Sequence, residues 1–304
     1  MTNTADIVLF TVNEFETQEV WRAFGVEGRA QPNGERTYWD YGEIAGARVV
    51  HAHSGMADLP ARKAAQAAMD AWQPTLLIAV GIAWGADRTM QSIGDILVTD
   101  PLIDAAHEKL SDKSGTEPRG VTFDQNDALR NILGNIARDL HRSTVATQGA
   151  LRIGPVLSLP RLVDMRAERD RLVNAYPDAI GGEMEGRGMV DAAVERKCDW
   201  LLIKAICDWG YNKNAATRQK DRDQKIAARN AADFVRYAVE NGLASYALHQ
   251  RTARGTTNAS ASAPPVAAPM FSIGVNHGTV AHTIHSLNVT VGTPNHGGVD
   301  GGNV

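Results

Sequence analysis

Cysteine is nearly absent from this 304-residue chain, which contains only Cys198 and Cys207. Both lie in or beside one predicted strand, so the sequence indicates no disulfide framework and favours a reducing cytoplasm. A basic excess is also missing: 31 Lys and Arg stand against 35 Asp and Glu, and a net charge of −4 gives no general attraction to nucleic acid. No apolar run is long enough to span a bilayer, and no basic and apolar segments of a signal peptide are visible. We therefore expect no membrane and no nucleic-acid partner.

Hydrophobic residues make up 43% of the chain and charged residues 22%, which suits one large globular domain with an extension, or two domains. Buried strands of an α/β sheet are expected in apolar runs at 6–12, 75–80, 151–158 and 200–207, and two more strands within 41–53. Helices are expected over 59–72, 126–141, 164–176 and 219–241, with Gly242 as the C-cap of the last. Residues 101–124 are polar, and we expect an irregular surface segment there.

Two carboxylates stand where such a sheet would place a ligand. Asp208 follows the apolar run at 200–207, and ligands bind at the carboxyl ends of strands in open α/β sheets. Apolar surroundings would raise its pKa, which suits a general acid. Glu185 lies in the segment 182–186, where a predicted strand ends and a helix begins. The alternative is that Asp208 only caps a helix or turns a loop.

The end of the first predicted strand carries a third carboxylate. Asn13 is a plausible N-cap, and Glu16 stands at the position that completes a capping box, which is a sufficient structural account of Glu16. The strand at 75–80 is followed by 81–87, which we expect to be a loop bounded by glycines whose backbone can approach a ligand closely. An ordinary strand-to-helix turn would have the same residues.

These residues also carry a family resemblance. The pattern E-M-E-G at 183–186, followed after about twenty residues by I-C-D-W-G at 206–210, resembles the purine nucleoside phosphorylase and nucleosidase superfamily. Within it the chain is most similar to the methylthioadenosine/S-adenosylhomocysteine nucleosidase branch, over about residues 5–245. The resemblance implies a three-layer α/β sandwich with a mixed central sheet. It also implies a homo-oligomer, in which a neighbouring subunit often completes the pocket.

The resemblance implies roles for individual residues. Asp208 would protonate N7 of a purine leaving group, Glu16 would activate the attacking water, and Glu185 would bind the sugar hydroxyls. An acid and a base on opposite sides of the bond is the usual arrangement for cleaving a glycoside. The other substrate-binding residues expected from the resemblance are Met184, Glu183, Ile82, Gly81, Met56, Arg161, Leu162 and Val163.

The implied reaction is hydrolysis of the N-glycosidic bond of a purine nucleoside or nucleotide. Water is favoured over phosphate as nucleophile because the first turn is acidic, with Glu14 and Glu16, and because Ile82 stands where phosphorylases often have serine. The segments around Glu185 and Asp208 look similar to nucleosidase domains of defence proteins, which implies an effector that acts on adenine nucleotides such as ATP. The alternatives are a housekeeping methylthioadenosine/S-adenosylhomocysteine nucleosidase, a purine nucleoside phosphorylase, or a non-catalytic nucleoside sensor.

The C-terminal residues differ in composition from the rest. We expect a catalytic domain over 1–248, a flexible Ser/Ala/Pro/Thr linker over 249–269, and a β-prone assembly tail over 270–304. The tail alternates apolar and small polar residues and looks like amyloid-type signalling motifs, which implies assembly into a filament; a disordered tail is the alternative. Four of the nine histidines lie in it without the spacing of a compact metal site, so we expect no metal, and nothing in the chain implies a cofactor.

Overall fold

A computed structural model describes residues 4–25, 29–33, 36–111, 115–142, 149–212 and 217–261. Twelve strands are found among the described residues: β1 (Ile7–Thr11), β2 (Arg29–Asn33), β3 (Arg36–Ile44), β4 (Ala47–His53), β5 (Leu76–Gly85), β6 (Ile96–Asp104), β7 (Glu108–Ser111), β8 (Gly115–Pro118), β9 (Val121–Phe123), β10 (Leu151–Ser158), β11 (Gly181–Glu183) and β12 (Asp199–Asp208). The helices there are α1 (Glu14–Phe24), α2 (Asp58–Trp72), α3 (Asp127–Arg142), α4 (Arg166–Ala175), α5 (Gly186–Glu195), α6 (Thr217–Ala238), the π-helical turn η1 (Val239–Leu243) and α7 (Ala244–Ala261).

Ten of the twelve described strands form one mixed central sheet, as predicted. Its order is β11-β10-β6-β12-β5-β1-β4-β3-β2, with β9 paired to β6, while β7 and β8 form a separate two-stranded ribbon. β1 lies parallel between β4 and β5, and β5 is parallel to β12. β11 pairs with β10 on one side and antiparallel to β5 on the other, so this end of the sheet closes on itself. The carboxyl ends of β1, β5 and β12 therefore meet beside β11.

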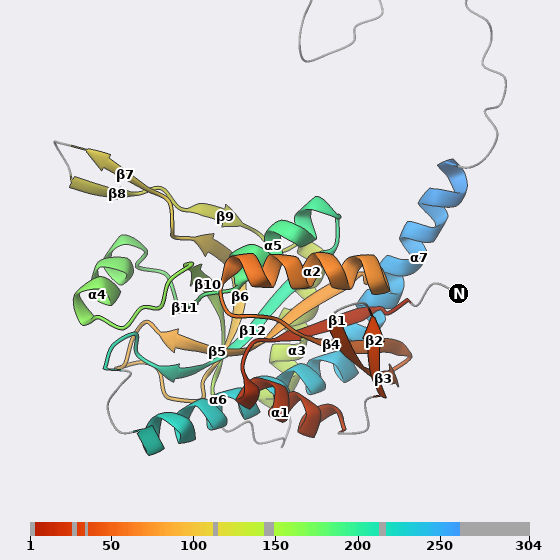
Figure 1. The fold of residues 1–304 in the computed structure, drawn as a ribbon, viewed down its shortest axis with the longest axis horizontal. Helices are drawn as coiled ribbons and strands as arrows, with labels where there is room; N and C mark the ends of the chain where they lie inside the picture. The colour runs from red at the N-terminus through yellow and green to blue at the C-terminus, as the bar shows by residue number, and fades with distance from the viewer. Residues whose placement is uncertain are drawn as a thin grey trace, which may run out of the picture. The chain divides into compact units, whose positions relative to one another are not determined.

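Helices cover both faces of the sheet and complete a three-layer sandwich (Figure 1). On one face α2 and α5 pack their buried alanine, methionine and valine side chains against the sheet. On the other face lies the larger hydrophobic core, which α1, α3, α6 and α7 share with β1, β5 and β12. The central strands are buried on both faces, which explains why their sequences are almost continuously apolar. The predicted fold class is confirmed.

Two sequence-based expectations are wrong, and a third is incomplete. The segment at 81–87 is not a loop from its start, because β5 continues to Gly85: Gly81 and Ile82 still pair with Lys204 and Ala205 of β12. The segment at 101–124 is not irregular, because it contains the end of β6 and the short strands β7, β8 and β9. The expected helix end at Gly242 is incomplete. The helix is interrupted there, since Asn241 and Gly242 have non-helical dihedral angles, but a helix resumes beyond it as α7.

The predicted linker therefore begins too early. Residues 249–261 belong to α7, and the compact unit of the chain extends to Ala261. The expectations for residues 262–304, namely the remainder of the linker and the β-prone assembly tail, lie outside the described residues.

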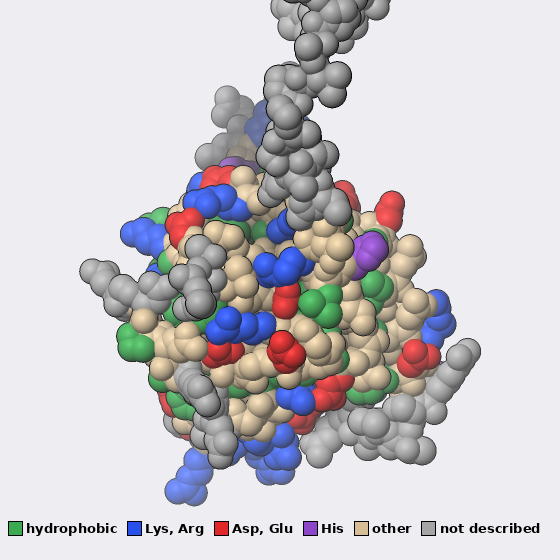
Figure 2. All heavy atoms as spheres, turned by 90° about the vertical axis from the view of Figure 1, so that its right-hand side faces the viewer, with side chains coloured by type: hydrophobic (Ala, Val, Ile, Leu, Met, Phe, Trp, Pro, Cys, Tyr) green, Lys and Arg blue, Asp and Glu red, His purple; other side chains and the backbone are tan. Residues whose placement is uncertain are grey.

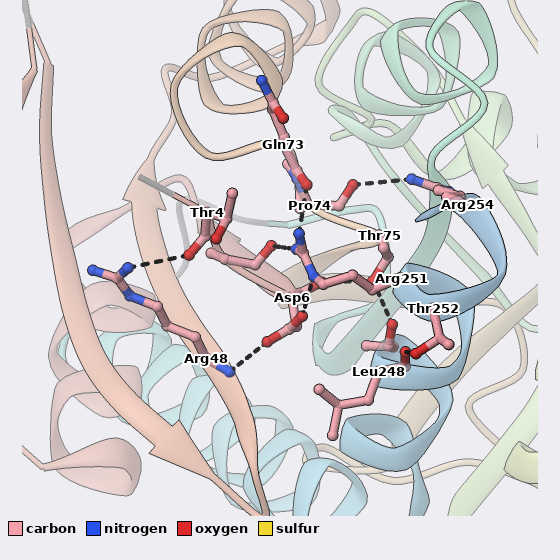
Figure 3. A network of polar contacts seen from close by, with 12 residues as sticks. Thr4, Asp6, Arg48, Gln73, Pro74, Thr75, Leu248, Arg251, Thr252 and Arg254 are labelled. Atoms are coloured by element: carbon pink, nitrogen blue, oxygen red, sulfur yellow. Dashed lines mark hydrogen bonds and ion pairs between the residues drawn. The ribbon is translucent and has the colours of Figure 1, made fainter. Parts of the chain in front are cut away.

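α7 is held by two arginines at the amino ends of three parallel strands (Figure 3). Arg251 donates to the Asp6 carboxylate and the Ala5 carbonyl oxygen at the start of β1, and to Gln73 O at 3.3 Å before β5. Arg254 donates to Pro74 O at 3.2 Å and to Lys197 O at 2.6 Å, before β12. These contacts use carbonyl groups that the strands leave unpaired at their ends. They fix α7 to the edge of the sheet opposite the carboxyl ends of the same strands.

We expect Arg251→Ala to lower the free energy of unfolding by about 2–3 kcal/mol, because it leaves the buried Asp6 carboxylate without its charged partner. Denaturant melts read by circular dichroism measure this difference. Arg222→Ala is the matched control, since Arg222 is exposed on α6, and it should change the free energy by less than about 0.5 kcal/mol. Equal stability of the two variants would contradict the assigned role.

The surface around α7 carries interspersed charges. Figure 2 shows acidic and basic side chains side by side on this face, with single hydrophobic side chains between them. The described residues drawn there therefore lack the continuous basic stripe that binds a nucleic-acid backbone. In the part of the chain that the structure describes, no helix is both long and apolar enough to cross a bilayer.

Candidate active site

A cavity of about 400 Å³ opens at the carboxyl ends of β1, β5 and β12, beside β11. Eight of the eleven residues singled out from the sequence line it: Glu16, Met56, Ile82, Leu162, Glu183, Met184, Glu185 and Asp208. They come from six different parts of the chain, so only the fold brings them together. The cavity lies where an open α/β sheet is expected to bind its ligand.

The other three residues lie near the cavity without lining it. Gly81 lies directly behind it, against the Glu16 carboxylate. Val163 is buried in a small core cluster between α4 and β10. The guanidinium of Arg161 forms an ion pair with Glu168 of α4 at 2.6 Å, in a separate and more open pocket that also contains Leu162. Leu162 is thus the member of this segment that reaches the cavity.

Glu16 is held by three backbone N–H groups. Its Oε2 accepts from Val12 N at 2.7 Å and from Asn13 N at 3.1 Å, while Asn13 caps the Glu16 amide in return. This is the expected capping box. Its Oε1 accepts from Ile82 N at 2.9 Å on β5. The capping role and a role in the cavity do not exclude each other, because the carboxylate caps α1 and lines the cavity at once.

Gly81 is required by this arrangement. A Cβ atom at position 81 would lie 2.2 Å from Glu16 Oε1, far inside van der Waals contact. Glycine is therefore needed here because of the side chain that lies against it, whereas the sequence suggested a loop whose backbone approaches a ligand. The consequence is that β5 can run past Glu16 and offer it the Ile82 amide.

The segment 183–186 supplies two carboxylates with different surroundings. Glu183 is buried, and its Oε2 accepts from the amides of Glu185 at 2.9 Å and Gly186 at 2.7 Å, at the amino end of α5. Burial raises the pKa of Glu183 to about 7. Glu185 Oε1 accepts from Ala57 N at 3.3 Å, before α2. Glu183 thus organises the turn, and Glu185 extends from it into the cavity.

Lys204 is the residue that sequence reasoning missed. It lies in the middle of β12, is 1% exposed, and its Nζ is 3.6 Å from Glu185 Oε2. Burial alone would lower its pKa, but the charges of Glu185, Glu16 and Glu183 outweigh this effect and raise the pKa above its ordinary value. A lone lysine inside an apolar strand run was the available signal, because a lysine is almost never fully buried without a partner.

Lys204 and burial act on Glu16 in opposite directions. Burial raises the pKa of Glu16, and the nearby Glu185 adds to this rise, whereas the positive charge of Lys204 lowers the pKa. Lys204 therefore offsets the negative charge of these largely buried carboxylates. The three glutamates that line the cavity and the lysine beneath it are each nine-tenths buried or more.

Asp208 is the last residue of β12 and is half-buried. The pairing of β12 with β5 shifts between Ile206 and Asp208, so Cys207 is an extra residue in this strand. Such a bulge changes the direction in which the following side chain points. The Asp208 carboxylate accepts from Gly210 N at 2.8 Å through Oδ1 and from Cys207 Sγ at 3.2 Å through Oδ2. Gly210 has a φ of +70°, which closes this tight turn.

The residues that line the cavity suit proton transfer and the binding of hydroxyl groups. Among the described residues, no three His, Cys, Asp or Glu side chains form a group that could hold a metal ion. Both cysteines are buried, and neither forms a disulfide.

Comparisons with known proteins agree on the fold. Among solved structures, methylthioadenosine/S-adenosylhomocysteine nucleosidase from Neisseria meningitidis aligns with a TM-score of 0.64 at 20% identity, over 78% of this chain and 99% of the other. Futalosine hydrolase from Helicobacter pylori aligns with a TM-score of 0.64 at 17% identity, over 78% and 98%. At these identities the likeness shows a common fold.

Among curated sequences, the death domain-containing ATP nucleosidase of the sponge Amphimedon queenslandica is 26% identical over 208 residues, which cover 63% of this chain and 38% of the sponge protein. The matched region thus spans less than half of that relative. Methylthioadenosine/S-adenosylhomocysteine nucleosidase of Listeria innocua is 28% identical over 195 residues, covering 63% of this chain and 81% of the relative. The family model described as phosphorylase superfamily matches residues 6–240. Since this match covers most of the chain, the protein belongs to the phosphorylase superfamily.

Proposed function

We propose that this chain is a nucleosidase that hydrolyses the N-glycosidic bond of a purine nucleoside or nucleotide. The observation that carries the proposal is that Glu16, Glu185 and Asp208, which lie far apart in the sequence, line one cavity of about 400 Å³. A purine riboside is a ligand of the size that such cavities accommodate. The relatives named as nucleosidases support the same reaction.

Each carboxylate has a role in the proposed mechanism. Breakage of the bond leaves positive charge on the ribosyl group and negative charge on the base, so the base must be protonated as it leaves. Asp208 donates this proton to the purine. Glu16 accepts a proton from the water that attacks the other side of the sugar carbon, and Glu185 binds the ribose hydroxyls. General acid and general base groups of this kind each contribute roughly 10²–10⁴-fold to a rate.

Water is the proposed nucleophile. The backbone amides of Val12, Asn13 and Ile82 are the donors that could hold a phosphate at this place, and all three donate to the Glu16 carboxylate. A phosphate anion beside this carboxylate would be repelled by its negative charge and would find these three donors already in use. A water molecule needs only an acceptor for its proton, which Glu16 provides.

The proposed biological role is that of an effector that consumes adenine nucleotides. Its support is the Amphimedon queenslandica relative, which is named a death domain-containing ATP nucleosidase and of which the match covers 38%. This chain likewise continues beyond the catalytic unit, for 43 residues after Ala261. A housekeeping enzyme for methylthioadenosine is the competing proposal, and the Listeria relative favours it.

A substrate panel tests both proposals. Purified full-length protein is incubated with ATP, AMP, adenosine and methylthioadenosine in phosphate-free buffer, and free adenine is measured by chromatography. Release of adenine without phosphate is expected, with nucleotides among the substrates. Adenine release that appears only after phosphate is added would identify a phosphorylase. Turnover of methylthioadenosine alone would leave a salvage enzyme and refute the effector role.

A further inference from the structure

The α6 wall of the cavity contains a cation that the proposed mechanism does not use. Lys220 and Gln224, one helical turn apart on α6, both line the cavity. Among the described residues that line it, Lys220 is the only basic one, beside five carboxylates. Lys204, by contrast, lies beneath the cavity and is neutralised by Glu185 and its neighbours.

Lys220 is also free to bind a ligand. Its side chain is exposed, and within the described residues it makes no hydrogen bond and no ion pair. Of the five lining carboxylates, Glu14 lies on the wall of α1 and accepts from Gln18 at 2.8 Å. The other four carboxylates already have roles: they hold the turn before α5, bind the sugar hydroxyls, protonate the leaving base and activate the water (Glu183, Glu185, Asp208 and Glu16, respectively). A lysine with no internal partner at the mouth of an acid-lined cavity therefore has a ligand as its best available partner.

The proposed function orients the substrate relative to this wall. With the base at Asp208, the ribose hydroxyls at Glu185 and the water at Glu16, three sides of the sugar are occupied. The side of the sugar that carries C5′ has no contact among these three. The lining residues left for it include Lys220 and Gln224 of α6 and the apolar Phe15 of α1, which have no other role in the proposed mechanism.

We propose that Lys220 and Gln224 form a subsite for a 5′-phosphoryl group, so that the preferred substrates are purine nucleotides. This inference rests on the proposed function and specifies its substrate class. The ammonium group binds the phosphoryl oxygens as a point charge, and the Gln224 amide donates a second hydrogen bond. Glu14 at the rim repels the same group, so the two α-helical walls have opposite effects on nucleotide binding.

The test compares AMP with adenosine. Lys220→Ala should lower kcat/KM for AMP roughly 10- to 100-fold, the loss expected for one hydrogen bond to a charged group, and should leave adenosine within about twofold. Glu14→Gln should raise the kcat/KM for AMP relative to that for adenosine, because it removes a negative charge that repels the phosphoryl group. Raising the ionic strength should weaken AMP turnover in the wild type more than in Lys220→Ala.

Lys225→Ala is the matched control, because Lys225 is an exposed lysine of the same helix that does not line the cavity. It should leave both substrates unchanged. If Lys220→Ala lowered kcat/KM equally for AMP and adenosine, or did not lower it for AMP, the phosphoryl subsite would be refuted. Continued cleavage of adenosine would still support the proposed function. If the wild type released adenine from no substrate, the proposed function itself would fail, and the subsite would fail with it.

Discussion

Replacing Asp208 by asparagine should reduce adenine release by about 10²–10⁴-fold, the range that a general acid contributes. The amide cannot supply the proton that the departing purine needs. It still presents an oxygen to Gly210 N, which donates to Oδ1 at 2.8 Å in the wild type, so the turn after β12 keeps its main hydrogen bond. The loss should therefore appear mainly in kcat. Single-turnover measurements of adenine release, with substrate binding followed by calorimetry, test this expectation.

Asp223→Asn is the matched control. Asp223 lies on α6 and lines the neighbouring cavity of about 300 Å³, which also contains Asp208, but it does not line the cavity of the site. This variant should keep its activity. The same experiment separates an enzyme from a nucleoside sensor: a sensor would bind ligand tightly in the wild type without releasing adenine, and Asp208→Asn would then change no rate.

The strand and carboxylate pattern was readable in the sequence because it is local. Apolar runs of buried parallel strands are visible without a partner strand, and the residue that follows each run marks the carboxyl edge of the sheet. Asp208 and the capping box at Glu16 were found in this way. The family resemblance connected them with Glu185, which no spacing rule could have done across the 169 positions that separate residues 16 and 185.

The wrong expectations depend on contacts between distant segments. Gly81 suggested the end of a strand, yet pairing with β12 carries β5 onward, and the missing side chain makes room for Glu16. Gly242 does interrupt a helix, but the sequence did not predict the helix that resumes beyond it, which Arg251 and Arg254 fix to carbonyl groups more than 50 residues away in the sequence. In both cases the course of the chain at or after the glycine depends on tertiary contacts.

Lys204 shows most clearly how contacts between distant segments escape sequence analysis. Its replacement should cause a large loss in the free energy of unfolding. Lys204→Met keeps an unbranched apolar stem but removes the charge between Glu16, Glu183 and Glu185, all of them buried. Removing one partner of a buried charge cluster typically costs about 3–5 kcal/mol, because the remaining charges stay uncompensated. We expect a loss of this size in the free energy of unfolding at pH 8, measured by urea denaturation. Lys63→Met, at an exposed lysine of α2, is the matched control and should show no comparable loss.

The destabilisation should depend on pH in a defined direction. Without Lys204 the pKa of Glu16, already raised by burial, rises further in the folded protein, while the unfolded chain keeps the ordinary value near 4.5. A carboxyl group with a raised pKa in the folded state stabilises below its unfolded pKa, and this stability is lost as the pH rises through the folded pKa. The difference between wild type and Lys204→Met should therefore be smaller at pH 5 than at pH 8. The acid limb of the kcat/KM profile, set by Glu16, should move to higher pH in the same variant. A difference in stability that is constant over this range, with an unmoved acid limb, would show that Lys204 does not control the charge of the site.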